Sequence, residues 1–234
     1  MSGLPRRILA VGAHPDDVEL LCAGTLAKFV TTGSEIHIAV VCRGDRGGAA
    51  PGLPAIRQEE ARRAAAVLGA PLTFLGIGDA EVRETPEMRS LFIDLLRDVR
   101  PELILTHGPN DYHDDHTTTS RLIVACAWYA ASAGHHGEQP ALDTPPAILY
   151  MDNVAGVGCE PTYLVDITDT IVLKRRMLAC HRSQLRRSDS GLPDLEELAE
   201  TLARLRGFQC GVRYAEGFRA APHWGRRRPE PLLP

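Results

Sequence analysis

Three short, almost continuous apolar runs, each followed by a segment with helical spacing, constrain the fold of this chain more than any other feature. The runs cover residues 7–12, 36–42 and 102–106 of the 234-residue sequence. A strand that is apolar at consecutive positions is typical of a parallel sheet whose two faces are both covered by helices. The sequence therefore predicts an α/β fold with a mostly parallel sheet and right-handed crossovers.

The other predicted elements complete a Rossmann-like three-layer architecture with helices on both faces of the sheet. Further strands are expected at residues 72–77, 147–151 and 163–167, and helices at residues 18–32, 55–68, 86–99, 117–131, 169–184 and 194–205. Strands and helices cease to alternate in the last third, which we expect to form a C-terminal cap region over the strand ends. We expect residues 1–222 to form a single domain and the Pro/Arg-rich residues 223–234 to form a poorly ordered tail.

Composition places the chain among ordinary globular proteins and argues against several kinds of partner. Charged residues make up 24% of the sequence, and a formal net charge of -4 gives no general attraction to nucleic acid or to an anionic membrane. No stretch approaches the roughly 18 apolar residues of a membrane span. Since the first strand begins too early to leave room for a signal peptide, we expect a cytoplasmic protein. A homo-oligomer is compatible with the sequence but cannot be read from it.

The six cysteines are spread along the chain without any Cys-x-x-Cys pair. Several of them lie inside apolar helical or strand segments, where a free thiol behaves as a small hydrophobic side chain. We therefore interpret them as core thiols, in preference to a disulfide framework or a thiolate zinc site. They are Cys22, Cys42, Cys126, Cys159, Cys180 and Cys210.

Side chains that bind metals follow two of the predicted strands. They form two clusters, His14-Pro15-Asp16-Asp17 after residues 7–12 and His113-Asp114-Asp115-His116 after residues 102–106. Because the carboxyl ends of parallel strands meet at one edge of a sheet, we expect the clusters to lie together. Two imidazoles and one carboxylate, with a position left for water, are a ligand set of hydrolytic zinc sites, and further carboxylates remain for proton transfer. The sequence therefore predicts a metal site at this edge.

Individual residues near the clusters have more than one interpretation. Asp17 could simply cap the helix that follows it, although capping does not explain the neighbouring acid and histidine. His107, at the end of a predicted strand, is either a partner of the metal ligands or a satisfied core histidine. Arg57 and Glu60 are three apart on a predicted helix and can pair on one face. The Gly-rich residues 43–48 form either a binding loop or a plain flexible connection.

Other function classes also use strand-end sites. A dinucleotide or methyl-donor enzyme needs a Gly-rich turn after the first strand, and here that turn holds a histidine and two acids. A two-metal phosphoesterase could draw on the additional acids of both clusters and is the main alternative. A non-catalytic, metal-containing sugar-binding protein is a second alternative.

The clusters, together with three further motifs, resemble the PIG-L, or LmbE-like, family of zinc-dependent N-deacetylases, which act on N-acetylglucosamine conjugates. The resemblance extends from residue 7 to about residue 218 and covers nearly the whole chain. The motifs that carry it are Ala13-His14-Pro15-Asp16-Asp17, Arg57-x-x-Glu60-Ala61, His113-x-Asp115-His116, His181-x-Ser183-Gln184 and Tyr214-Ala215-Glu216-Gly217-Phe218.

This resemblance implies a metal centre and an amide hydrolase mechanism. His14, Asp17 and His116 are then the ligands of a zinc ion, or of another divalent transition metal. Asp16 is the general base, which takes a proton from the metal-bound water and passes it to the departing amine.

The resemblance also assigns roles to residues around the metal. His113 stabilises the oxyanion and is held by Asp115, while Arg57 contacts the substrate and is held by Glu60. The expected substrate is a soluble amino sugar with an N-acetyl group, because this chain lacks the membrane anchor of the lipid-linked branch. Residues 43–48, with two arginines and Asp45, and residues 131–157 carry no role that the motifs define.

Overall fold

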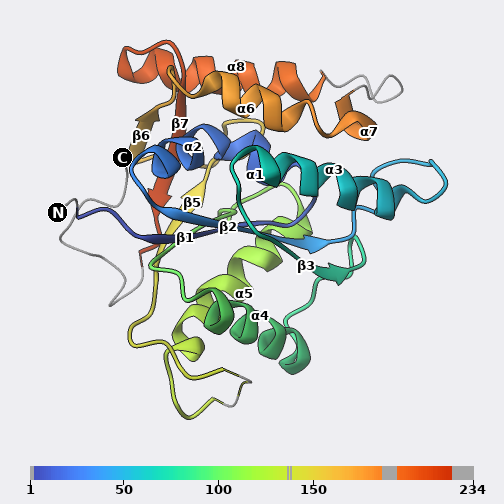
Figure 1. Ribbon diagram of the computed structural model, residues 1–234, viewed down its shortest axis with the longest axis vertical. Coiled ribbons are helices and arrows are strands. Elements are labelled where there is room, and N and C mark those ends of the chain that lie inside the picture. Colours follow the sequence, from blue (N-terminus) through green and yellow to red (C-terminus); the bar gives the residue numbers. More distant parts are fainter. Residues whose placement is uncertain (1–2, 136, 138, 186–193, 223–234) are drawn as a thin grey trace.

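The computed structural model describes residues 3–135, 137, 139–185 and 194–222. Its strands are β1 (Arg7–Gly12), β2 (Glu35–Cys42), β3 (Leu72–Ile77), β4 (Leu103–Thr106), β5 (Ala147–Met151), β6 (Tyr163–Asp166) and β7 (Ala215–Ala220). They form one sheet in the order β3-β2-β1-β4-β5-β7-β6 (Figure 1). Strands β1 to β5 are parallel, and β7 lies antiparallel to both β5 and β6. The mostly parallel α/β sheet predicted from the sequence is confirmed.

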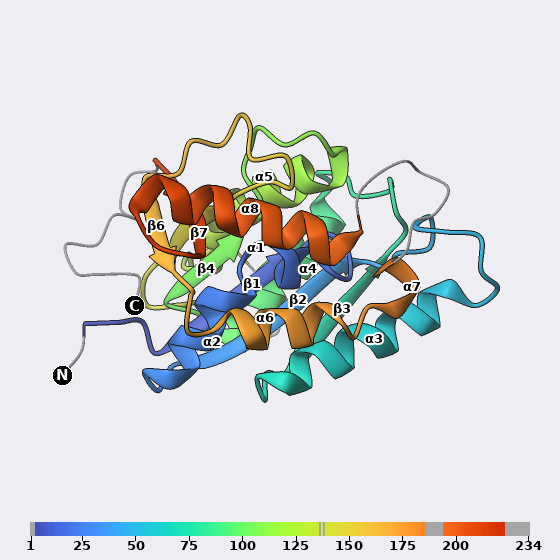
Figure 2. The same ribbon diagram turned by 90° about the horizontal axis from the view of Figure 1, so that it is seen from above.

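Helices cover both faces of this sheet. They are α1 (Asp17–Leu21), α2 (Ala23–Thr31), α3 (Leu53–Val67), α4 (Pro86–Val99), α5 (Asp114–Ala130), α6 (Ile171–Leu178), α7 (Arg182–Leu185) and α8 (Leu195–Cys210). Helices α4 and α5 lie on one face, and α1, α2 and α3 lie on the other (Figure 1). The C-terminal helices α6 and α8 pack over α1 and α2, as seen from that side in Figure 2.

The two faces explain why the strands are apolar at consecutive positions. Ile8 and Leu103 are buried on the face of α1 and α2, whereas their chain neighbours Leu9 and Ile104 are buried on the face of α4 and α5. Successive side chains of a strand point to opposite faces, so a strand covered on both sides needs apolar residues at every position. The apolar runs therefore place β1 and β4 side by side at the centre of the sheet.

Several element boundaries differ from the prediction, and three of these differences affect the fold or the site. The helix expected at residues 18–32 is broken at Cys22, whose φ of -144° is not helical, into α1 and α2. The helix expected at residues 169–184 is likewise divided into α6 and α7. Helix α5 begins at Asp114, three residues earlier than expected, so His116 lies in its first turn.

The last third also contributes to the sheet itself. We expected a cap and one strand, at residues 163–167, from this region, but β7 was not predicted, and it inserts between β5 and β6. Its sequence, AEGFRA, has neither an apolar run nor a regular alternation of apolar and polar residues. A charged residue, Glu216, can be buried in this strand because contacts from elsewhere in the chain stabilise it. The cap and the sheet extension are therefore parts of one C-terminal region.

The structure tests the expectations about membrane spans and cysteines, but not those about the tail and the domain division. The tail expected at residues 223–234 lies outside the described residues, and the division into one domain and a tail stays a prediction. No helix within the described part of the chain is long and apolar enough to cross a membrane. All six cysteines are free, and Cys22, Cys42, Cys126 and Cys159 are buried, as expected for core thiols.

Candidate metal centre

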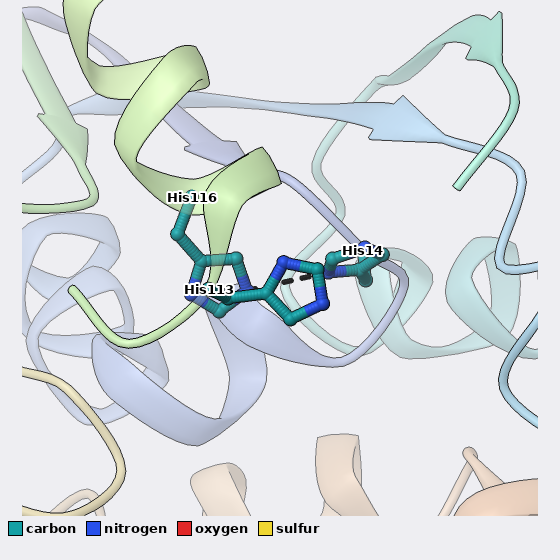
Figure 3. A group of neighbouring side chains, drawn as sticks. All are labelled: His14, His113 and His116. Atoms are coloured by element: carbon teal, nitrogen blue, oxygen red, sulfur yellow. Dashed lines mark hydrogen bonds between the residues drawn. The ribbon is translucent and has the colours of Figure 1, made fainter. Parts of the chain in front are cut away.

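The two predicted clusters meet at the carboxyl ends of β1 and β4. His14 lies in the turn after β1, and His116 lies in the first turn of α5 (Figure 3). Asp17 is the first residue of α1, directly after the turn that carries His14. His14 Nδ1 lies 3.2 Å from His116 Nε2 and 3.6 Å from Asp17 Oδ2, and His116 Nε2 lies 3.5 Å from Asp17 Oδ2. A tetrahedral zinc ion about 2.1 Å from each ligand separates its ligand atoms by about 3.4 Å. The three donor atoms therefore fit one such cation.

Both histidines of this triangle have a carboxylate behind the ring. Asp115 Oδ2 lies 3.1 Å from His14 Nε2, and Asp111 Oδ1 lies 3.1 Å from His116 Nδ1. A carboxylate on the far nitrogen fixes the orientation of a ligating imidazole and increases its basicity. Asp111 was not predicted, although an acid five residues before His116 in the same loop was a signal that could have found it.

Asp17 is held by residues on two elements. Its Oδ2 accepts a hydrogen bond from the His14 backbone N–H at 2.7 Å and lies 3.1 Å from His107 Nε2. The fully buried His107 ring also stacks on His116 with centroids 3.9 Å apart. His107 is thus a partner of the metal-binding residues, which decides between its two interpretations. The carboxylate of Asp17 turns back to His14, so helix capping does not account for it.

The protonation of the cluster follows from this crowding. Burial alone would raise the pKa of Asp17, but the neighbouring His116 and His107 hold it well below its usual range. Burial alone would lower the pKa of His14, but hydrogen bonds with Asp115 and Asp17 raise it. The pKa of His116 is raised against the effect of burial by Asp17 and Asp111. The carboxylates thus favour the protonated forms of both rings, and a cation that binds here has to displace those protons.

Asp16 lies beside the triangle without belonging to it. It is buried, and its φ of 114° is one that non-glycine residues rarely adopt. Burial raises the pKa of the Asp16 carboxyl, and Arg57 opposes that shift. Arg57 Nη2 donates to Asp16 Oδ2 at 3.2 Å and to the Pro15 carbonyl at 2.6 Å. The turn therefore presents a carboxylate with elevated proton affinity next to the ligand atoms.

The expected pair between Arg57 and Glu60 does not form. Glu60 accepts instead from the backbone N–H and the hydroxyl of Ser183, at 2.8 and 2.7 Å. Arg57 is buried, and a further hydrogen bond reaches the Gly44 carbonyl in the loop after β2. Its direct contacts are therefore with Asp16 and the neighbouring backbone, and a contact with substrate stays a prediction.

His113 is the most exposed histidine of the two clusters. Its side chain is 38% exposed, and its ring centroid lies 4.7 Å from that of His14 and 4.9 Å from that of His116 (Figure 3). Burial lowers the pKa of His113, as do the neighbouring His14 and His116. His113 Nδ1 accepts the Asp115 N–H at 3.2 Å, which leaves the proton of a neutral ring on Nε2. The ring can thus donate a hydrogen bond from the mouth of the site.

The expectation that the Asp115 carboxylate holds His113 is corrected by these distances. Asp115 Oδ2 lies 3.9 Å from His113 Nδ1 but 3.1 Å from His14 Nε2, and it also accepts the Ala80 N–H at 2.8 Å. The reason is positional, because Asp115 lies in the first turn of α5 and points past His113 toward β1. Asp115 supports His113 chiefly through its backbone N–H, at 3.2 Å.

Other groups of donor atoms overlap with the triangle. His113 joins His14 and His116, and Cys42 joins His14 and Asp115, with ligand atoms within 4.8 Å of one another in each group. Asp17, His107 and His116 form a further group of this kind. Each group of this kind in the described part of the chain contains His14 or His116, so a cation held by the triangle uses a residue that every other group needs.

Comparisons with known proteins agree with this geometry. The diacetylchitobiose deacetylase of Thermococcus kodakarensis is 29% identical over 93% of this chain and 84% of its own length. The N,N'-diacetylchitobiose deacetylase structure from Pyrococcus horikoshii superimposes with a TM-score of 0.83 at 26% identity, over 93% of this chain and 84% of that one. A 4-oxalmesaconate hydratase from Pseudomonas putida is 28% identical over 75% of this chain and 73% of its own length.

The family model described as GlcNAc-PI de-N-acetylase, PIG-L, matches residues 9–127. This range covers about half of the chain and includes both metal-binding clusters, which confirms the resemblance that their motifs indicate. The solved deacetylase fold extends the similarity through the C-terminal strands and helices. On the sequence match and on the fold alike, the chain belongs to the PIG-L family.

Proposed function

We propose that the protein is a zinc-dependent hydrolase that removes the acetyl group from the N-acetyl amide of an amino sugar. The observation that carries this proposal is the triangle of His14 Nδ1, Asp17 Oδ2 and His116 Nε2, with edges of 3.2 to 3.6 Å, beside an unligated Asp16. The triangle suits a single tetrahedral cation with one position left open. When bound, such a cation supplies the Lewis acidity that activates water and polarises an amide carbonyl.

Asp16 is the residue suited to move protons in this reaction. Its buried carboxylate takes the proton from the attacking water and returns it to the departing amine. Burial raises the pKa of Asp16, so both its protonation states become accessible closer to neutral pH. Arg57 orients this carboxylate through its hydrogen bond at 3.2 Å.

His113 is suited to stabilise the charge that develops on the carbonyl oxygen. Its Nδ1 accepts the N–H of Asp115, so its Nε2 carries the hydrogen that can be donated. Such a donor, fixed before the reaction, stabilises an oxyanion without reorganisation. Asp115 acts mainly on His14, whose Nε2 it contacts at 3.1 Å, and thereby orients a ligand.

An amino-sugar amide is favoured as substrate by the sequence alignments. The diacetylchitobiose deacetylase of Thermococcus kodakarensis aligns with 93% of this chain and the hydratase with 75%, although a hydratase structure from Pseudomonas putida superimposes over 97% of it at a TM-score of 0.81 and 24% identity. A two-metal phosphoesterase is disfavoured because a cation in the triangle uses both His14 and His116, and every other candidate ligand group in the described part of the chain needs one of them. Amide hydrolysis thus accounts for the single cation, the base and the hydrogen-bond donor together.

The test is an assay of acetate release from N-acetylglucosamine and N,N'-diacetylchitobiose, with and without a chelator. We expect release that the chelator abolishes and that zinc restores. His14→Ala and His116→Ala should lose both metal, measured by elemental analysis, and activity. Zinc at one equivalent without acetate release would support the sugar-binding alternative, whereas hydrolysis of phosphate esters or hydration of 4-oxalmesaconate would support another enzyme class.

A further inference from the structure

An exposed aromatic side chain lies at the mouth of the metal centre and has no part in the mechanism above. Tyr112, in the loop between β4 and α5, is 67% exposed. Its ring centroid lies 5.7 Å from that of His116, at 69°, and 6.0 Å from that of His113, at 79°. The tyrosine ring is therefore steeply inclined to the two imidazoles, and most of its surface is open to solvent beside the ligand triangle.

A second apolar residue continues this side of the mouth. Val157 is 68% exposed in the loop that follows β5, and a Cβ on its neighbour Gly158 would lie 3.7 Å from the Asn110 carbonyl oxygen. This loop thus lies against the loop that carries Tyr112. Arg206 fixes it from α8 by donating to the Asp152 carboxylate and to the carbonyls of Gly156 and Cys159.

The opposite side of the mouth is polar. Ala80 donates its N–H to Asp115, and Arg83 donates to the Ala80 carbonyl at 2.9 Å and lies 3.8 Å from Asp114. A ligand that reaches the metal thus meets an apolar side formed by Tyr112 and Val157 and a polar side formed by the loop after β3. A pyranose ring has matching surfaces, since its hydroxyl groups project around the ring while one face carries C–H groups.

We propose that Tyr112 is a specificity-determining residue, whose ring face packs against the pyranose ring of the substrate while the acetamido group reaches the metal. This inference rests on the proposed deacetylase function and adds to it the residue that contacts the sugar ring. Aromatic rings supply large apolar contact area at a low cost in conformational entropy, which suits them to binding such a face. The contact concerns binding, and it leaves proton transfer to Asp16.

The experiment compares Tyr112→Phe, Tyr112→Leu and the wild type with N-acetylglucosamine as substrate. We expect Tyr112→Leu to raise KM about tenfold with kcat changed less than twofold, because truncating an aromatic anchor commonly costs such a factor. Tyr112→Phe keeps the ring and should remain within about twofold of the wild type. The matched control is Tyr163→Leu on β6, whose tyrosine is 45% exposed and distant in the sheet order, and it should leave KM unchanged.

Any other result with the Tyr112 variants would contradict the proposed contact, and each result would indicate a different reason. Unchanged KM in Tyr112→Leu would show that the ring does not touch the sugar. An equal loss in Tyr112→Phe would assign the contact to the hydroxyl, and a fall in kcat alone would make Tyr112 part of the chemical step. Metal content is measured for every variant, so that loss of zinc is not mistaken for loss of sugar contact. A wild type that releases no acetate from any amino sugar would remove the proposed function and this inference together.

Discussion

At the scale of single residues, the metal centre is organised in two layers around one small triangle of donor atoms. His14, Asp17 and His116 supply the triangle, and Asp115 and Asp111 hold the far nitrogens of the two rings. Residues in the second layer have no contact with substrate, yet they set the orientation and basicity of the ligands. Substitution of a ligand is therefore expected to abolish metal binding, whereas substitution of a residue behind a ligand is expected to weaken it.

Asp16→Asn is expected to keep its metal and lose catalysis. The amide cannot take a proton from water, so kcat should fall by at least about 100-fold, the usual contribution of a general base. Metal content and acetate release are measured on the same preparation. Asp114→Asn is the control, because Asp114 is an exposed acid of the same loop cluster and should leave both quantities unchanged. Loss of metal in Asp16→Asn would instead make this carboxylate a ligand.

Asp111→Asn is expected to weaken metal binding without abolishing it. The amide no longer offers a negative charge to His116 Nδ1, and loss of such a partner typically reduces metal affinity about 10- to 100-fold. Competition with a chromophoric chelator measures the dissociation constant. Asp143→Asn, an exposed acid outside the site, serves as control. An unchanged affinity would show that Asp111 does not support the ligand.

The ligand triangle could be predicted from residue types and spacing, but its surroundings could not. His14, Asp17 and His116 follow strand ends, so the topology brings them together whatever the details of the loops. The direction of Asp115 depends on α5 beginning at Asp114, and the helical pattern predicted that start three residues too late. Arg57 and Glu60 have a spacing that permits a pair, but Asp16 and Ser183 compete successfully for them. Such competition is tertiary and leaves no local signal.

At the scale of elements, one carboxylate explains two differences between prediction and structure. Glu216 on β7 accepts the N–H groups of Gly24 and Thr25, at 3.0 and 2.7 Å, and so caps α2 from outside. Lys174 donates to Glu216 at 2.6 Å and to the Leu20 carbonyl of α1 at 2.7 Å. The sequence around Cys22 predicts a continuous helix. The contacts of Glu216 and Lys174 therefore explain why the helix is interrupted there. The same buried Glu216 interrupts the apolar pattern of residues 215–220, so this pattern did not predict β7.

Glu216→Gln is expected to destabilise the fold strongly. It would leave the buried Lys174 ammonium without a counter-charge, which should lower the free energy of unfolding by about 3 kcal/mol. The double variant Glu216→Gln with Lys174→Met should recover part of that loss, because the two residues interact directly. Urea denaturation measures each value, and the exposed Glu59→Gln is expected to change stability by no more than about 0.5 kcal/mol. Additive losses in the double variant would contradict the pairing.

At the scale of the whole molecule, the metal centre joins parts of the chain that are about 100 residues apart. The sheet order brings β1 and β4 together, and each then contributes a ligand-bearing turn. The alternation of strands and helices in the sequence predicted the parallel centre of the sheet. It did not predict the antiparallel edge formed by β7 and β6. A cation that binds both turns binds only the folded chain, so metal binding and stability are coupled.

Zinc is therefore expected to raise the melting temperature. At a free zinc concentration about 100 times the dissociation constant the gain is about 2.7 kcal/mol, or roughly 5 to 10 °C for a protein of this size. The raised pKa values of His14 and His116 set the pH dependence: below them, protons compete with zinc and also stabilise the metal-free fold, so the difference should shrink as pH falls. Differential scanning calorimetry at several pH values measures it. His116→Ala should abolish the zinc-dependent shift, and a shift independent of pH would contradict proton displacement.

The backbone of Asp16 has a consequence for how this protein can be improved. Its φ of 114° is a conformation that glycine adopts freely and that costs other residues on the order of 1 to 3 kcal/mol. A library of variants sorted only for heat resistance would accordingly enrich glycine at this position and discard the base with it. Thermal stability favours glycine at position 16, whereas catalysis requires aspartate there. Variants of this protein therefore have to be selected for both stability and activity.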